Sequence, residues 1–184
     1  MEPAAEPASG SAPLKGPLLL DPNVLVALLD PQHCQHRPVQ RWFAGHAAAQ
    51  GWATCPASER LVLAVMTHPD FPGRLTLEQA AMRLARLRAW PGHRFWAEAV
   101  DLGAFPSPIL WTLVPAAGAL ADLELLALAV VHDGVLVTLG RRVPLQALRG
   151  PCRLRHWQPL DDQLRCFPLP SPGPEGARLP PKQG

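Results

Sequence analysis

The sequence predicts a three-layer α/β/α sandwich around a central, mostly parallel sheet. Short apolar runs alternate with segments of helical periodicity, and strands joined by helices pair in parallel. The chain has 184 residues, of which 48% are hydrophobic, and this suits one domain with a single buried core. We therefore expect one α/β domain flanked by tails.

The first expected element is a strand formed by the three leucines at residues 18 to 20. Asp21 ends this strand. Pro22 suits the first turn of a helix over residues 23 to 29, because the N–H that proline lacks has no partner there. Asp21 therefore lies at a joint between strand and helix, where its carboxylate can cap the helix.

The middle of the chain predicts one further strand and three helices. A helix over residues 38 to 49 ends before Gly51, and the WATC segment at residues 52 to 55 forms the strand. Helices follow over residues 58 to 66 and 76 to 89. The last of these is expected to bury the apolar side chains at helical spacing, which are Leu77, Ala80, Ala81, Leu84 and Leu87.

The last part of the domain predicts two more strands, over residues 93 to 98 and 135 to 138. The second, VLVT, is rich in β-branched side chains. A short helix is expected over residues 108 to 114 and a longer one over residues 121 to 131. Helices thus separate the strands along the chain, which is the pattern of a parallel sheet.

Both ends of the chain predict disorder. Residues 1 to 16 and 161 to 184 are rich in proline and small residues without apolar periodicity, so we expect the domain to span residues 17 to 160. The net charge of +2 is too small to attract nucleic acid over the whole surface. The longest apolar run, residues 125 to 131, is too short for a membrane helix, and a signal-peptide pattern is missing, so a cytoplasmic protein is expected.

Three acidic side chains are expected at one edge of the sheet. Asp21 follows the first strand, Glu59 lies near the start of the helix after WATC, and Asp122 opens the helix before the last strand. Ligands gather at the carboxyl ends of parallel strands. Clustered carboxylates repel one another, and oxygen ligands favour Mg²⁺, with Mn²⁺ as a substitute. In the alternative interpretation, Asp21 and Asp122 only cap helices and Glu59 is solvated.

Two other chemistries fit the sequence poorly. His33, Cys34 and His36 share one loop, but no second ligand pair lies at zinc-finger spacing. The four cysteines include no C-x-x-C pair, so we expect buried thiols and no dense disulfide framework. A phosphatase of the haloacid dehalogenase type needs a second Asp two residues after the first, where this chain has Asn23.

Three segments resemble, in the same order, the PIN-domain ribonucleases of the VapC toxin type. Asp21, followed by Asn23 and Leu25, matches the end of that family's first strand, and Ser58 with Glu59 matches the pair that follows the W-A-T-C-like strand. The third match is the helix motif of Asp122, Leu125, Ala127, Leu128 and Ala129. The resemblance covers about residues 18 to 150, nearly the whole expected domain.

The resemblance implies a PIN-like fold and Mg²⁺-dependent hydrolysis of phosphodiester bonds in RNA. Asp21 and Asp122 would hold the ion and Glu59 would bind it directly or through water, so these three are the expected catalytic acids. The supporting residues are expected to be Asn23, Ser58 and Thr138 beside the carboxylates, and Arg141 and Arg142 at the RNA phosphates. The family also implies a homodimer and a VapB-like antitoxin whose chain end covers the acidic pocket.

One departure from the family pattern concerns activity. The family closes with T-F-D, whereas this chain reads Thr138, Leu139, Gly140, so Gly140 replaces a fourth acid. Three carboxylates leave surplus positive charge on two divalent ions, and a second ion would bind weakly or only together with RNA phosphate. Glu124 and Asp133 lie nearby in the sequence, but neither is expected to face the site. The alternative function is therefore a degenerate PIN domain that binds its partner or RNA without turnover.

Overall fold

A computed structural model describes residues 16–97, 100–104, 107–140, 143–149 and 154–156. The predicted leader, apart from Gly16, and the predicted tail lie outside these residues. Within the described ranges, the structure contains no helix of sufficient length and apolar character to cross a membrane.

The sheet has five strands in the order β3-β2-β1-β4-β5, and every neighbouring pair is parallel. The strands are β1 (Leu18–Leu20), β2 (Trp52–Thr54), β3 (His93–Phe95), β4 (Val135–Thr138) and β5 (Leu154–His156). The predicted parallel sheet is confirmed. The edge strand β5 was not predicted, because its Leu-Arg-His sequence carries no apolar run.

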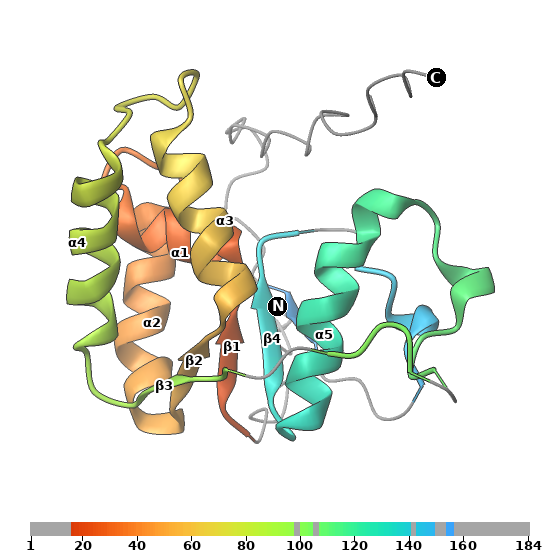
Figure 1. Cartoon of the computed structure of the whole chain (residues 1–184). Helices are drawn as coiled ribbons and strands as arrows, with labels where there is room; N and C mark the ends of the chain where they lie inside the picture. Colours follow the sequence, from red (N-terminus) through yellow and green to blue (C-terminus); the bar gives the residue numbers. More distant parts are fainter. Residues whose placement is uncertain (1–15, 98–99, 105–106, 141–142, 150–153, 157–184) are drawn as a thin grey trace, which may run out of the picture.

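In the described part of the chain, five α-helices cover the two faces of the sheet and make the predicted three layers (Figure 1). The helices on one face are α1 (Pro22–Leu29), α2 (His36–Gln50), α3 (Pro56–Thr67) and α4 (Leu77–Arg88). Helix α5 (Leu120–Val131) lies on the other face. All five correspond to predicted helices, with ends that differ by a few residues.

The predicted helix over residues 108 to 114 is wrong. The segment contains only a short 3-10 helix, η1 (Trp111–Leu113), and two further 3-10 helices follow at η2 (Ala117–Ala119) and η3 (Leu145–Ala147). Before η1, Ile109 makes an isolated antiparallel bridge to Leu148. Pro115 follows soon after η1, and proline opposes continuation of a helix.

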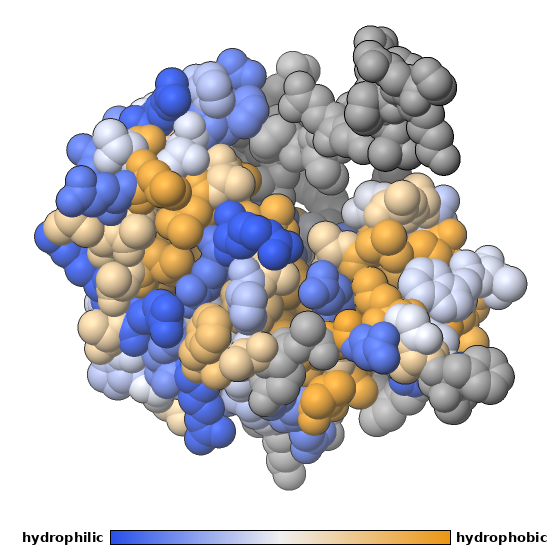
Figure 2. Space-filling view, in the orientation of Figure 1, coloured by the Kyte–Doolittle hydropathy of each residue, from blue (hydrophilic) through white to orange (hydrophobic). Residues whose placement is uncertain are grey.

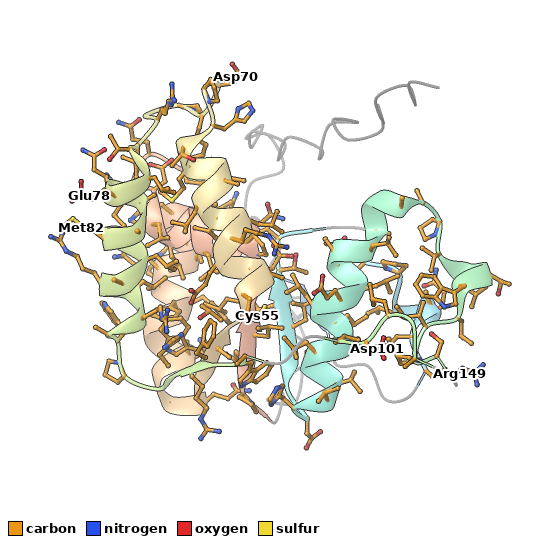
Figure 3. All side chains as sticks on the ribbon, viewed as in Figure 1. Cys55, Asp70, Glu78, Met82, Asp101 and Arg149 are labelled. Atoms are coloured by element: carbon orange, nitrogen blue, oxygen red, sulfur yellow. The ribbon has the colours of Figure 1, made fainter. Side chains whose placement is uncertain are left out.

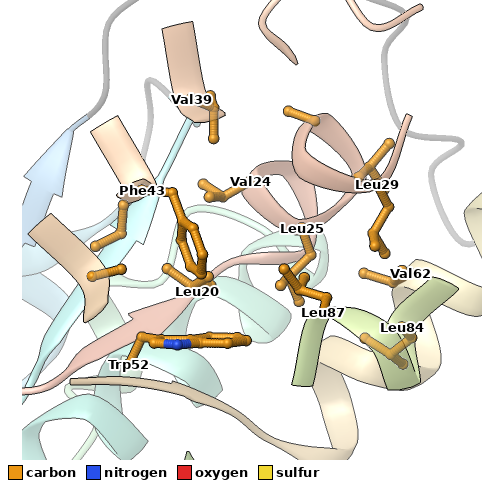
Figure 4. Packing of buried hydrophobic residues seen from close by; sticks show 14 of the residues in the cluster. Leu20, Val24, Leu25, Leu29, Val39, Phe43, Trp52, Val62, Leu84 and Leu87 are labelled. Carbon is orange, nitrogen blue, oxygen red and sulfur yellow. The ribbon is translucent and has the colours of Figure 1, made fainter. Parts of the chain in front are cut away.

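Two apolar clusters occupy the two faces of the sheet. Leu18 and Leu20 belong to the cluster under α1 to α4, whereas Leu19 belongs to the cluster under α5, as alternation along a strand requires. In the larger cluster, the rings of Phe43 and Trp52 meet edge to face with centroids 5.0 Å apart (Figure 4). Burial of all three leucines explains why the first strand is a continuous apolar run.

Helix α4 buries only part of the apolar stripe that the sequence predicts. Ala80, Leu84 and Leu87 are buried, but Ala81 is exposed and 63% of Leu77 is accessible. The prediction was wrong for Leu77 and Ala81 because α4 packs on α3 and α1 through one narrow face. Figure 2 shows exposed hydrophobic side chains interleaved with hydrophilic ones over this face of the molecule.

The cysteines only partly follow the expectation of buried thiols. Cys55 is a buried free thiol, but Cys34 is bonded in a disulfide. The two remaining cysteines, Cys152 and Cys166, lie outside the described residues.

Candidate active site

Asp21 lies at the carboxyl end of β1, in the joint that the sequence predicts. Its backbone N–H donates to the Val137 carbonyl of β4 at 2.9 Å. Its Oδ1 accepts from the Asn23 N–H at 2.7 Å and so caps α1. Only 2% of Asp21 is accessible. The sheet therefore holds the backbone, and the helix start orients the carboxylate.

Thr138, the last residue of β4, supports Asp21 from the neighbouring strand. Its Oγ1 accepts from the Gly140 N–H at 2.8 Å, and its side chain hydrogen-bonds to the Asp21 carboxyl. A hydroxyl has one proton to donate, and here that proton goes to the carboxylate. Thr138 is itself buried, so the hydrogen bond is shielded from water.

Asp122 lies near Asp21, and each carboxyl resists ionisation. Burial raises the pKa of Asp21 to about 6, against the lowering effect of the hydrogen bonds from Asn23 and Thr138. The charge of Asp122 raises this pKa further. Burial also raises the pKa of Asp122, which is half-buried. The charge of one carboxyl thus acts on another that lies about a hundred residues away in the chain.

Helix capping does not explain Asp122. It is the third residue of α5, whose cap is Ala119, and no side chain caps that helix end. Among the described residues, neither Asp21 nor Asp122 takes part in an ion pair. The interpretation of both aspartates as simple caps is therefore wrong for Asp122. Among the described residues, no cationic side chain balances the negative charge of the two aspartates.

Glu59 lies in the first turn of α3, where Thr54 and Arg88 bind its carboxylate. Its Oε1 accepts from the Thr54 hydroxyl at 2.5 Å, and its Oε2 pairs with an Arg88 guanidinium nitrogen at 3.2 Å. Only 15% of its side chain is accessible, so the description of Glu59 as solvated is also wrong. Within the part of the chain that the structure describes, no three acidic, histidine or cysteine side chains form a metal-ligating group. A part for Glu59 in a metal site stays a prediction.

Of the remaining residues predicted for the site, Ser58 and Gly140 lie among the described residues. Ser58 forms a capping box with Cys55: its Oγ accepts from the Cys55 N–H at 3.0 Å. Arg141 and Arg142 lie outside the described residues. A Cβ at Gly140 would meet Thr138 Oγ1 at 3.1 Å, so the position of the missing acid borders the residue that holds Asp21.

The two acids considered as replacements for the fourth carboxylate lie elsewhere. Glu124 lines a cavity of about 140 Å³ between the start of α3 and α5, together with Cys55 and Arg60. Figure 3 shows Cys55 at that end of α3. Asp133 precedes β4 and therefore lies at the opposite end of that strand from Thr138. Neither takes the place of the acid that Gly140 replaces.

Three residues around Glu59 were missed by sequence reasoning. They are Thr54, His93 and Arg88, which come from β2, β3 and the end of α4. Thr54 is the last residue but one of the predicted strand over residues 52 to 55, and its place near the carboxyl end of that strand was a usable signal. Arg88 follows Glu59 by 29 positions in the chain, and no local spacing relates the two.

The parallel α/β sandwich, with Asp21 at the carboxyl edge of its sheet, has the architecture expected of a PIN-like protein. Comparison with curated proteins gives the family. Ribonuclease VapC44 of Mycobacterium tuberculosis is 34% identical over 140 residues, which span 72% of this chain and 92% of the relative. Ribonuclease VapC38 of the same organism is 36% identical over 134 residues, 68% of this chain and 92% of that protein. The chain belongs to the VapC family of PIN-domain toxins.

Two further comparisons were with family models and with solved structures. No family model matches the chain. Among solved structures, VapBC2 from Rickettsia felis bound to a DNA fragment from its promoter aligns with a TM-score of 0.49 and 12% identity, over 77% of this chain and 98% of that one.

Proposed function

We propose that this chain is a Mg²⁺-dependent endoribonuclease toxin that hydrolyses phosphodiester bonds in RNA. The VapC relatives named ribonucleases support the reaction class. The observation that carries the proposal is the pair of a buried Asp21 and a half-buried Asp122, in which the charge of Asp122 raises the pKa of Asp21 and neither has a described cationic partner. A fold tolerates such a pair where it serves a cation or a reaction.

The acid pair suits a hard divalent cation. Mg²⁺ is commonly bound by one or two carboxylates together with water and substrate phosphate. Two carboxylates also balance the charge of one divalent ion, and Mn²⁺ accepts the same oxygen donors. When bound, the cation would supply charge stabilisation at the phosphate oxygens and lower the pKa of the attacking water.

The side chains around the pair would prepare it for this task. Asn23 and Thr138 hold the Asp21 carboxylate in one orientation, so little ordering remains when substrate binds. Ser58 stabilises the turn before Glu59, which would join the site directly or through water. Arg141 and Arg142 follow the end of β4 in the chain, where cationic side chains would bind the phosphates beside the scissile bond.

The family membership also suggests how activity is restrained. We propose that a VapB-like antitoxin places one end of its chain over the acidic pocket, and that the toxin forms a homodimer and acts in the cytoplasm, where its RNA substrate occurs. A carboxylate pair that lacks a described cation is a fitting target for a basic side chain of such a partner.

Purified protein tests the proposal directly. With Mg²⁺ or Mn²⁺ it should cleave structured RNA, and Asp21→Asn should abolish cleavage because a neutral amide holds a divalent ion poorly. The matched control is Asp70→Asn, in the exposed loop between α3 and α4 (Figure 3), which should keep full activity. Equal cleavage by wild type and Asp21→Asn would refute the assignment.

Gly140 supports a second candidate, a degenerate PIN domain that binds its partner or RNA without turnover. The fourth acid of the family pattern is missing, and no described residue replaces it. Gly140→Asp discriminates between the two candidates, because the added carboxylate would lie next to Thr138. A large gain of cation affinity and cleavage would favour degeneracy, whereas unchanged cleavage would show that the acids present suffice.

A further inference from the structure

Of the three acids that the family pattern expects in the site, Glu59 is bound in an ion pair with Arg88, whereas Asp21 and Asp122 have no described ion pair. We propose that Arg88 acts as a latch: it holds Glu59 away from Asp21 and Asp122, so that Glu59 reaches a cation at the aspartate pair only by giving up Arg88. This inference rests on the proposed function, because it concerns the same cation. It makes Arg88 a positioning residue that acts through Glu59.

Hydrogen bonding occupies both oxygens of the Glu59 carboxylate. The Thr54 hydroxyl has one proton, and it donates that proton to Oε1 at 2.5 Å. Thr54 Oγ1 also lies 2.9 Å from Nε2 of His93, so the histidine nitrogen must be the donor in that contact. A chain of donors thus runs from His93 through Thr54 to Glu59, while Arg88 binds the second oxygen.

Contacts other than the ion pair with Glu59 also hold Arg88 in position. It is the last residue of α4, a helix that the buried Leu84 and Leu87 fix against the core. Its guanidinium lies 4.9 Å from the ring centre of Phe95 on β3, within cation–π range. An arginine held by a ring and a carboxylate loses less freedom when the ion pair forms, so this pair is stronger than an ordinary surface pair.

The latch changes the charge available to a cation. With Glu59 neutralised by Arg88, the aspartate pair alone faces the ion, and Gly140 offers no further carboxylate. Release of Glu59 would restore a third acid to the site.

Titration calorimetry with Mn²⁺ on the full chain, without RNA, tests the latch. Arg88→Gln should bind Mn²⁺ about tenfold more tightly, because a free Glu59 then joins the aspartates. Arg88→Lys keeps the charge and should remain close to wild type. The matched control is Arg86→Gln, which removes the same charge from an exposed position on the same helix and should leave the affinity unchanged.

A double-mutant cycle with Glu59→Gln separates the latch from the general effect of removing a positive charge. Glu59→Gln alone should change the affinity by less than about twofold, and it should cancel the gain in the Arg88→Gln background. A gain that persists in the double mutant would overturn the latch, as would an Arg88→Gln protein that binds Mn²⁺ no more tightly than wild type.

The same titrations distinguish failure of the latch from failure of the proposed function. Wild-type binding that Asp21→Asn abolishes, with no gain in Arg88→Gln, overturns the latch and leaves the cation site intact. Absence of binding in every variant refutes both. Binding with the expected cycle but without RNA cleavage in any variant refutes the ribonuclease and supports the latch.

Discussion

The two carboxylate sites at the carboxyl edge of the sheet differ in how their charge is balanced. Glu59 has a hydroxyl and a guanidinium as partners, one on each oxygen. Burial raises the pKa of Asp21 and that of Asp122, and the charge of Asp122 raises the pKa of Asp21 further. A compensated acid contributes to the fold, whereas an uncompensated buried pair destabilises it unless a cation binds. The difference favours the two aspartates as the centre of the proposed active site.

The largest expected effect is on catalysis. Asp122→Asn should lower RNA cleavage by about a thousandfold, roughly 4 kcal/mol of transition-state stabilisation, because it removes half of the proposed cation site. Glu59→Gln should lower cleavage by less than about tenfold, since its charge is already paired in the folded protein. Single-turnover cleavage at saturating Mg²⁺ measures both. An equal loss in the two variants would remove the distinction between the sites.

Cation binding should stabilise the wild-type fold. At a Mg²⁺ concentration of one hundred times its dissociation constant, the free energy of unfolding should rise by about 2.7 kcal/mol, since the unfolded chain has no assembled site. Asp21→Asn should show no such rise, whereas Glu59→Gln should keep it. Thermal unfolding with and without Mg²⁺ gives the comparison, and stabilisation of Asp21→Asn would place the cation elsewhere.

The stability should also depend on pH through Asp21. Folding raises its pKa from 3.8 to about 6, so the folded state binds more protons than the unfolded state between these values. In EDTA, the free energy of unfolding should therefore fall as pH rises from 4 to 6, by roughly 2 kcal/mol, and the loss should persist at pH 7.

Asp21→Asn isolates this contribution, because asparagine also caps helices and does not titrate. The difference between variant and wild type in urea unfolding should grow in favour of the variant across the same pH window. A constant difference would mean that the Asp21 carboxyl ionises in the folded protein as it does in the unfolded chain.

The smallest expected effects come from a matched pair of hydroxyl deletions. Thr54→Val and Thr138→Val each remove a buried hydrogen bond to a carboxylate, at a cost of about 1 to 2 kcal/mol in unfolding free energy. Only Thr138→Val should weaken Mn²⁺ binding, because only Thr138 supports Asp21. Equal weakening by Thr54→Val would show that the Glu59 cluster belongs to the cation site.

Some features of the site were predictable from the sequence because their causes are local. The strand at residues 18 to 20, the proline after Asp21 and the cap formed by Asp21 follow from a few adjacent residues. The influence of Asp122 on Asp21 was predictable from topology, because a helix that leads into a parallel strand begins at the edge where the other strands end. The partners of Glu59 did not follow, because helix packing brings Arg88 to it.

The amino-acid order by itself determined the alternation of strands and helices, the parallel sheet and the edge that bears the acids, because apolar periodicity and turn residues act over short distances. Tertiary structure alone decided that Arg88 neutralises Glu59, that α4 leaves Leu77 exposed, and that the chain adds β5 as an edge strand. Charge compensation depends on distances between side chains that are far apart in the chain, and only the packed helices set those distances.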